Sequence, residues 1–140
     1  SVAGLERSGV RPANSVELDL MFPAPFTGAV TIGCREEDKV AYEASALLND
    51  ETTALCTRIE KDFLRVLMGG CSTPISALAI MKEGQLFFQG NILSLDGKEK
   101  AVVEFTVPAA ETKDLGTRAA NQLLAKGGDK IIAAIRNAGI

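Results

Sequence analysis

The stretch that decides the fold is residues 74–107, PISALAIMKEGQLFFQGNILSLDGKEKAVVEFTV. Its apolar and β-branched runs predict three strands, over 74–82, 85–95 and 100–107. Glu83-Gly84 separates the first two runs. Asp96-Gly97 joins the last two, and Asp-Gly is a strong signal for a two-residue hairpin. The stretch therefore predicts an antiparallel three-stranded meander.

A predicted helix precedes this meander. Asn49 or Asp50 is placed to cap it, and Gly69-Gly70 is expected to end it. Its apolar residues recur at spacings of three and four, as on one face of a helix; they are Leu55, Ile59, Phe63, Val66 and Leu67. The pattern indicates an amphipathic helix that packs against the sheet.

Two further helices are predicted after Pro108. The first carries an apolar face of Leu115, Ala119, Leu123 and Leu124. Gly127-Gly128 is expected to end it, and Asp129 to cap a last helix in which Ile131, Ile132 and Ile135 face inward. Together the elements predict an α+β fold, with a three-stranded antiparallel sheet covered on one face by helices.

Residues 1–50 show elements but little core of their own. Residues 2–8 are expected to form the tail of a helix ended by Gly9. Two strands are expected next, a short one in which Val16, Leu18 and Leu20 alternate with acidic residues and a buried one over 29–34. Glu36, Glu37 and Asp38 are expected to open a helix. The chain starts without Met and inside a predicted helix, so we expect its natural start to lie upstream of Ser1.

Composition narrows the class of protein. With 140 residues, 46% of them hydrophobic and 24% charged, the chain fits one globular domain, or one domain plus part of another. The net charge of −3 comes from scattered charges with no basic stripe, so we expect no nucleic-acid partner. No apolar run approaches the roughly 20 residues that a membrane-spanning helix needs, and no secretion signal is recognisable. We therefore expect a soluble, cytoplasmic chain without a membrane partner.

The cysteines and the absence of histidine limit the chemistry. Cys34, Cys56 and Cys71 are an odd number at wide spacings, which argues against a disulfide framework and against CxxC zinc or redox sites. The chain contains no histidine, which catalytic triads and most catalytic zinc sites require. We expect no metal site, and we expect Cys56, within the amphipathic helix, to be a small core residue.

Cys71 stands between Gly69-Gly70 and Pro74, at an irregular connection between a helix and a strand. Two interpretations remain open from the residues alone: a small buried side chain, or an exposed functional thiol. Thiolates are favoured at helix N-termini, whereas this cysteine follows a C-terminus. A turnover nucleophile is therefore disfavoured, while a permanent covalent attachment point is not.

Residues 60–75, EKDFLRVLMGGCSTPI, closely resemble the region of the porphobilinogen deaminase (hydroxymethylbilane synthase) family that holds its cofactor cysteine. Other segments resemble the family in the same order along the chain. They are Ala3–Arg7, Pro23–Pro25 with Gly28-Ala29, Cys34–Asp38, Leu48–Thr52 with Ala54-Leu55, and the Asp96-Gly97 hairpin. The resemblance covers nearly the whole chain.

The resemblance implies a three-domain transferase of tetrapyrrole (haem) biosynthesis, with this chain as its C-terminal part. Residues 51–140 would be the cofactor-attachment domain, and residues 1–50 the closing segments of the other two domains. In the family, the cysteine at the position of Cys71 forms a thioether to a dipyrromethane primer. Four porphobilinogen molecules are added to that primer, and hydroxymethylbilane is released. The resemblance further implies a monomer at full length.

The resemblance also implies roles for individual residues. Arg35 would bind the acetate and propionate groups of the growing polypyrrole; from the residues alone, a surface arginine paired with Glu36 or Glu37 is the favoured interpretation. Gly69 and Gly70 would be the pivot beside the cofactor, and Lys61 a possible anion contact. The family's catalytic aspartate has no counterpart here. The chain alone is therefore expected to have no catalytic residue, to be inactive and to lack the cofactor.

Three positions depart from the family. Phe26-Thr27 replace the usual Gly-Gln before Gly28-Ala29, which is expected to alter a backbone approach in that loop. Gly33 replaces a common glutamate, and Lys61 stands where arginine is frequent, exchanging a fork of donors for a point charge. The alternative function is a non-catalytic binding or interaction domain that keeps the fold with Cys71 unmodified. A thiol enzyme is disfavoured because no local base is present.

Overall fold

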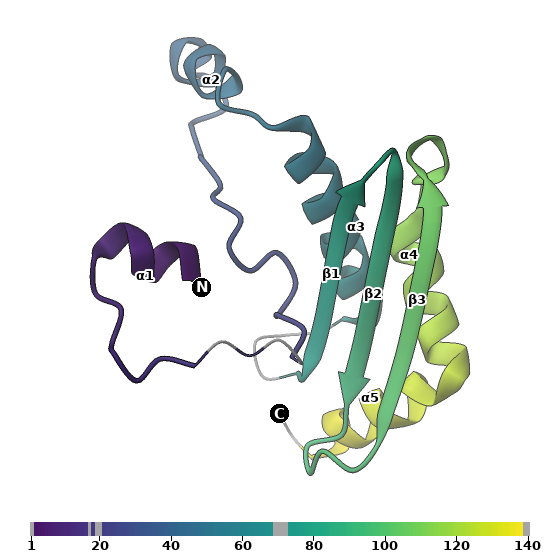
Figure 1. Cartoon of the computed structure of the whole chain (residues 1–140). Coiled ribbons are helices and arrows are strands. Elements are labelled where there is room, and N and C mark those ends of the chain that lie inside the picture. The colour runs from purple at the N-terminus through teal and green to yellow at the C-terminus, as the bar shows by residue number, and fades with distance from the viewer. Residues whose placement is uncertain (1, 17, 19–20, 69–72, 139–140) are drawn as a thin grey trace.

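The computed structural model of the chain describes residues 2–16, 18, 21–68 and 73–138. It shows a three-stranded antiparallel sheet with α3, α4 and α5 packed on one face, so the predicted α+β fold is confirmed (Figure 1). The elements of the chain, in order, are α1 (Val2–Ser8), α2 (Lys39–Ala46), α3 (Glu51–Leu67), β1 (Ile75–Lys82), β2 (Gln85–Leu93), β3 (Lys100–Pro108), the 3₁₀ turn η1 (Ala109–Glu111), α4 (Leu115–Leu123), the π-helical turn η2 (Leu124–Gly128) and α5 (Asp129–Asn137).

The strands follow the order β1-β2-β3, so β1 is an edge strand. The hairpin between β1 and β2 has the predicted two-residue turn, with φ of 52° at Glu83 and 74° at Gly84, as the twist of a type I′ turn requires. The expected two-residue turn at Asp96-Gly97 is wrong. Pairing between β2 and β3 ends at Leu93 and Lys100, because the Asp96 carboxylate accepts hydrogen bonds from Ser94 Oγ and Lys98 N and forms a wider local turn.

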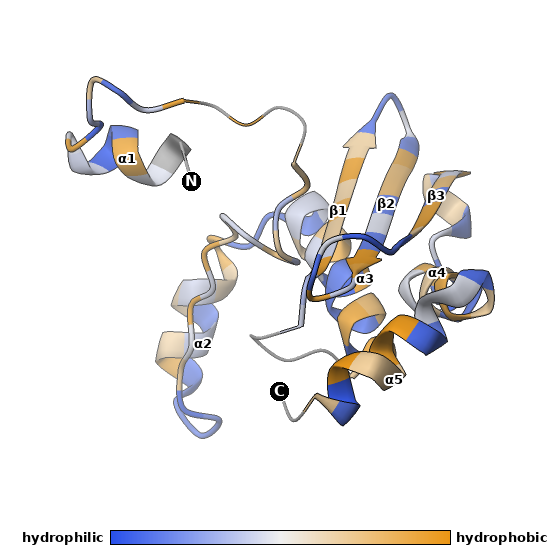
Figure 2. Cartoon of the chain, turned by 90° about the horizontal axis from the view of Figure 1, so that it is seen from below, coloured by the Kyte–Doolittle hydropathy of each residue, from blue (hydrophilic) through white to orange (hydrophobic). Residues whose placement is uncertain are grey.

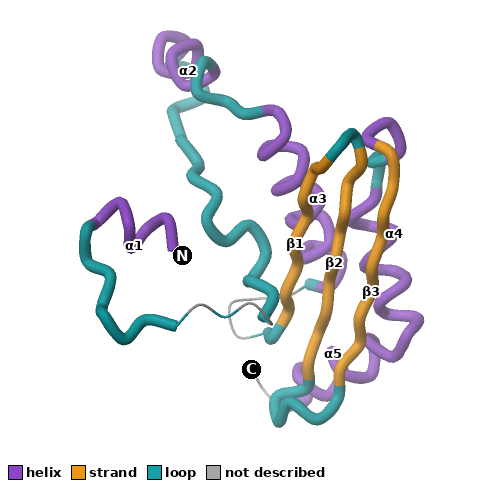
Figure 3. Tube along the Cα trace, viewed as in Figure 1, coloured by secondary structure: helices purple, strands orange, loops and turns teal. Residues whose placement is uncertain are grey.

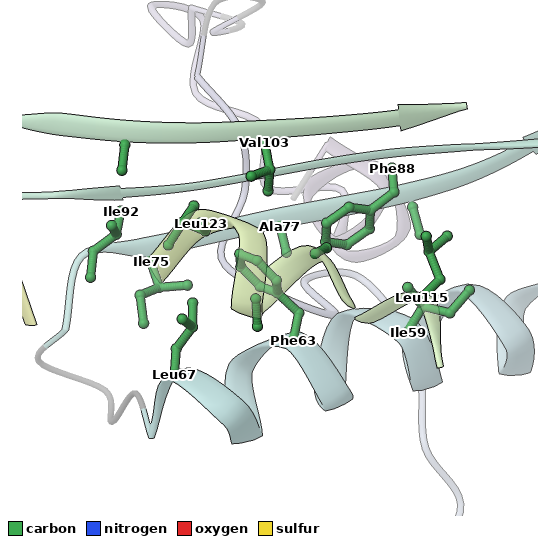
Figure 4. Close-up of a cluster of buried hydrophobic side chains, with 14 of the residues drawn as sticks. Ile59, Phe63, Leu67, Ile75, Ala77, Phe88, Ile92, Val103, Leu115 and Leu123 are labelled. Atoms are coloured by element: carbon green, nitrogen blue, oxygen red, sulfur yellow. The ribbon is translucent and has the colours of Figure 1, made fainter. Parts of the chain in front are cut away.

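The core lies between the inner face of the sheet and the three helices. Phe63 of α3 meets the ring of Phe88 of β2 edge to face, with centroids 5.2 Å apart (Figure 4). Gly90 leaves room for Phe63, since a Cβ there would lie 2.6 Å from Phe63 Cζ. Apolar residues recur along the strands and on α3 and α5 (Figure 2). The largest fully buried side chains are Phe63, Phe88, Leu67, Leu86, Ile92, Leu115, Leu123 and Val103.

The predicted caps of α3 are confirmed at one end and corrected at the other. Asp50 caps the N-terminus, where its Oδ1 accepts a 2.7 Å hydrogen bond from Thr53 N. The left-handed residue at the C-terminus is Met68, with φ of 52°, one position before the predicted glycine pair. The predicted stop after α4 is confirmed by Gly127, with φ of 100°. The predicted Asp129 cap is wrong: Asp129 is the first residue of α5, Gly128 occupies the N-cap position, and no side chain caps this end of the helix.

The N-terminal region differs most from expectation. The predicted helices are present as α1 and as α2, whose N-cap Asp38 accepts a hydrogen bond from Ala41 N at 2.9 Å. Residues 29–34, predicted as a buried strand, form an exposed loop, and the described part of the predicted strand near Val16 and Leu18 is also loop (Figure 3). A strand needs a hydrogen-bonded neighbour, and no described segment pairs with these residues. No helix in the described ranges is both long and apolar enough to cross a bilayer.

Candidate functional site

The predicted attachment segment connects α3 to β1, and Gly69, Gly70 and Cys71 lie outside the described residues. Both flanks of the segment are fixed in the core. Leu67, at the end of α3, and Ile75, at the start of β1, are buried in the same hydrophobic cluster (Figure 4). The cysteine therefore belongs to a connection of four residues, 69–72, held between Met68 and Thr73.

The helix side of this connection ends sharply at Met68. Its backbone N–H donates to the carbonyls of Arg65 and Leu64, while its own φ of 52° turns the chain away from the helix axis. The Met68 side chain is 75% exposed. Residues other than glycine adopt this left-handed conformation at a cost of about 1–2 kcal/mol, so the surrounding structure enforces the turn.

The strand side begins with two backbone hydrogen bonds. Ile75 N donates to Thr73 O at 2.8 Å, and Leu93 N donates to Pro74 O at 3.1 Å. The second bond ties Pro74 to the neighbouring strand β2. The chain is thus already part of the sheet two residues after the segment that carries Cys71.

Lys61, the predicted anion contact, lines an open groove of about 900 Å³ beside α3. The groove is bordered by the loop around Val30, by α2 and by the N-terminal half of α3. Arg58, one turn before Lys61, lines the same groove and was not singled out from the sequence. Neither cation forms an ion pair with another described residue. The two cations share one helix face because they are three residues apart.

Arg35 is exposed in the loop before α2, and it forms no ion pair with Glu36 or Glu37 among the described residues. The surface-pairing alternative is therefore not what the structure shows. Arg35 also does not line the groove, and no hydrogen bond in the described ranges joins it to Met68 or Thr73. Lys61 stands seven residues before Met68, about 10 Å along a helix axis. Within the described ranges, no hydrogen bond thus joins Arg35 to the flanks of the cysteine segment, and Lys61 lies about two helical turns before the nearer flank.

Glu60 is a buried carboxylate that the sequence reasoning missed. Its side chain is 5% exposed, and its two oxygens accept backbone hydrogen bonds from Phe26 N at 2.5 Å and Ala79 N at 2.7 Å. Burial raises the pKa of the Glu60 carboxyl, and these two hydrogen bonds oppose the rise. The signal was present in the sequence, because Glu60 lies on the apolar face of α3, four residues after Cys56 and three before Phe63.

The other two cysteines have different surroundings. Cys56 is buried in the core cluster, as predicted, and burial together with the negative charge of Glu60 raises the pKa of its thiol. Cys34 is an exposed free thiol in the loop before α2. A raised pKa leaves Cys56 protonated at neutral pH, so it is not a nucleophile. No group of three potential metal ligands gathers in the described part of the chain.

Comparison with known proteins gives consistent matches. Residues 54–125 match a family model described as porphobilinogen deaminase, C-terminal domain. The chain is 36% identical over 137 residues to a porphobilinogen deaminase of Syntrophotalea carbinolica, covering 96% of this chain and 44% of that protein. The chain is 33% identical over 140 residues to the porphobilinogen deaminase of Listeria monocytogenes serotype 4a, which covers 96% of this chain and 45% of that protein. The chain thus spans less than half the length of these relatives.

Proposed function

Because the chain belongs to the porphobilinogen deaminase family, we propose that it is the C-terminal part of the enzyme that polymerises four porphobilinogen molecules into hydroxymethylbilane in tetrapyrrole biosynthesis. The observation that carries the proposal is the family match over residues 54–125. This range spans most of α3, the whole sheet and α4, together with the connection that contains Cys71. Residues 51–140 would form the cofactor-attachment domain, and residues 1–50 the closing segments of two other domains. The full-length enzyme would be a cytoplasmic monomer.

The cofactor of this proposal is a dipyrromethane linked to Cys71 through a thioether. The described flanks suit such a group: the helix side ends on exposed Met68, and both ends are anchored by buried residues. A thiol is the right donor, since a thioether does not hydrolyse as an ester or imine does. When bound, the primer supplies the pyrrole carbon to which porphobilinogen units are added.

This chain's own residues would hold the primer and bind its charge. Cys71 fixes one end by its sulfur, and Gly69 and Gly70 allow the backbone beside it to change direction. The product carries acetate and propionate groups, so cations without acidic partners are the suitable binding groups. Among the residues that the structure describes, Arg35 has no acidic partner, and Lys61 is a second such cation that would act as a point charge.

One feature of the N-terminal region supports the division into domains. Residues 29–34 have the apolar composition of a buried strand, yet Val30 is 84% exposed and Ile32 is also exposed. Strands of this composition pair within a sheet, so we assign the partners of 29–34 to the remainder of the full-length enzyme. The catalytic aspartate would also lie there, and the present chain alone would be inactive and would carry Cys71 as a free thiol.

Intact-mass spectrometry of the full-length protein tests this proposal. We expect the wild-type mass to exceed the sequence mass by one dipyrromethane, and Cys71→Ser to remove that excess. Cys56→Ser is the matched control, since Cys56 is buried in the core and should leave the excess in place. An unmodified wild type that binds porphobilinogen without converting it would instead support the alternative, a binding domain that retains the fold.

A further inference from the structure

The free edge of β1 carries backbone N–H groups that β2 does not reach. In an antiparallel pair, alternate residues of an edge strand direct their N–H groups away from the neighbouring strand. Ala77 N donates to Pro23 O at 3.3 Å, and Ala79 N donates to the carboxylate of Glu60 at 2.7 Å. The edge is therefore covered by a turn from the N-terminal region and by one side chain of α3, as edge strands generally require.

The segment that covers the edge at Pro23 continues directly into a turn that spans Ala24 to Thr27. Thr27 N donates to Ala24 O at 3.1 Å, Pro25 is buried, and Phe26 has φ of 50°. This arrangement is that of a type II turn, with proline at the second position and a left-handed residue at the third. The turn directs the N–H of Phe26 inward, where it meets the second oxygen of Glu60 at 2.5 Å.

One carboxylate thus joins three parts of the chain that are distant in sequence. Phe26 lies 34 residues before Glu60, and Ala79 lies 19 residues after it. Each oxygen of the carboxylate accepts one of the two backbone hydrogen bonds. Because an ionised carboxylate has two equivalent acceptors, glutamate is suited to this bridge, whereas glutamine keeps only one acceptor oxygen.

The bridge is also the last firm attachment before the exposed loop. Among the described residues, no hydrogen bond joins 30–37 to α3 or to the sheet. Where the 24–27 turn is held therefore decides where the loop with Arg35 leaves the domain.

We propose that Glu60 is a positioning residue: its carboxylate fastens the 24–27 turn to α3 and to the free edge of β1, and thereby sets the point from which the loop carrying Arg35 departs. The attachment itself follows from the geometry of this chain. Its consequence for Arg35 rests on the proposed function. The two parts are tested by separate measurements.

Residue-resolved amide hydrogen exchange on this chain tests the attachment. In Glu60→Met, which keeps the length and apolar packing of the side chain, the Phe26 and Ala79 amides should exchange about 10- to 100-fold faster, as expected for lost hydrogen bonds to a charged group. Glu60→Gln should restore slow exchange at one of the two amides. Asp62→Asn, on the same helix but paired with Arg65, should change neither. Unchanged exchange at both amides in Glu60→Met would overturn the proposal.

A second measurement needs no variant and covers the case in which Glu60→Met unfolds. In the wild type, the amide proton shifts of Phe26 and Ala79 should follow the same titration as the Glu60 carboxyl carbon. The Cys56 thiol on α3 is electrostatically coupled to Glu60, and residues 24–27 and Ala79 contain no titratable side chain. Since a thiol titrates at a much higher pH than a carboxyl, the two titrations can be separated. If these amide shifts do not respond as Glu60 titrates, the proposed bridge is absent.

The role toward Arg35 is tested in the full-length protein. We expect Glu60→Met to raise KM for porphobilinogen more than it lowers kcat, and to raise it by a smaller factor when Arg35→Ala is already present. Equal factors in the two backgrounds would show that Glu60 does not act through Arg35. Full-length protein without a primer on Cys71 would contradict the proposed function, yet would leave the hydrogen-exchange result on Glu60 intact.

Discussion

Gly116 of α4 lies directly against the Ile59 carbonyl of α3, so closely that a Cβ at position 116 would stand 2.2 Å from the Ile59 oxygen. The neighbouring atom belongs to the backbone and cannot rotate away. The two helices reach this separation only because residue 116 has no side chain.

Gly116→Ala should therefore lower the free energy of unfolding by more than about 2 kcal/mol, because α4 must move off α3. Gly33→Ala is the matched control, since a Cβ at Gly33 meets nothing within 4 Å. It should change stability by less than about 0.5 kcal/mol. Urea denaturation measures both, and equal effects would contradict the helix packing described here.

The Phe63 side chain is the central contact of the core, fully buried against Phe88. Phe63→Ala should cost about 3–5 kcal/mol, because it removes a buried ring and leaves a cavity. The control is Phe87→Ala, which also removes a phenylalanine ring. Phe87 is the neighbour of Phe88 in β2 and is 42% exposed, so its loss should cost less than about 1 kcal/mol. A similar loss for the two variants would show that the assignment of sheet faces is wrong.

Phe26 holds a left-handed conformation that glycine adopts without strain. Phe26→Gly should raise the free energy of unfolding by about 0.5–1 kcal/mol, the relief of strain less the entropy of a more flexible chain. Thr27→Gly is the control at the neighbouring position, where φ is not positive, and should not stabilise. Thermal denaturation measures both variants. A higher melting temperature for Thr27→Gly than for Phe26→Gly would refute this assignment of strain.

Glu60 should make stability depend on pH in one direction. Burial raises its pKa, so the folded chain binds the proton more tightly than the unfolded chain does. The contribution of Glu60 to stability is thus largest below the unfolded-state pKa and falls as pH rises through the folded-state value. Each unit of separation between the two pKa values is about 1.4 kcal/mol. Glutamine does not titrate, so Glu60→Gln should gain stability relative to wild type across this window.

The measurement for Glu60 is urea denaturation of both proteins from about pH 4 to pH 7. The unfolding free energy of Glu60→Gln minus that of wild type should increase as pH rises, and it should level off above the folded-state pKa of Glu60. If this difference stays constant or decreases as pH rises, hydrogen bonding outweighs desolvation at the Glu60 carboxyl.

Much of the domain was predictable because its signals are local. The Glu83-Gly84 turn, the Asp50 cap and the apolar face of α3 each depend on residues within one or two turns of each other. The predicted strand over 29–34 failed because a strand also needs a partner, which the described residues do not supply. The place of Glu60 on the apolar face of α3 was a local signal, whereas its two partners lie 34 and 19 residues away and leave no local pattern.

The candidate site was predictable to a smaller extent. The motif around Cys71 identified the family, which the comparisons confirm. The arrangement of cations was not accessible from the motif. Arg35 and Lys61 were named together, yet the structure places Lys61 in a groove with Arg58 and leaves Arg35 outside it. Such an arrangement depends on how loops pack on a helix, which residue spacing alone does not determine.

The most direct test of the central claim is the mass of one tryptic peptide from the full-length protein. Cleavage after Arg65 and Lys82 releases Val66–Lys82, in which Cys71 is the single cysteine, and the peptide Val40–Arg58 reports on Cys56. We predict that Val66–Lys82 carries the mass of a dipyrromethane and that Val40–Arg58 is unmodified. An unmodified Val66–Lys82, in protein that converts porphobilinogen, would contradict the assignment of Cys71 as the attachment site.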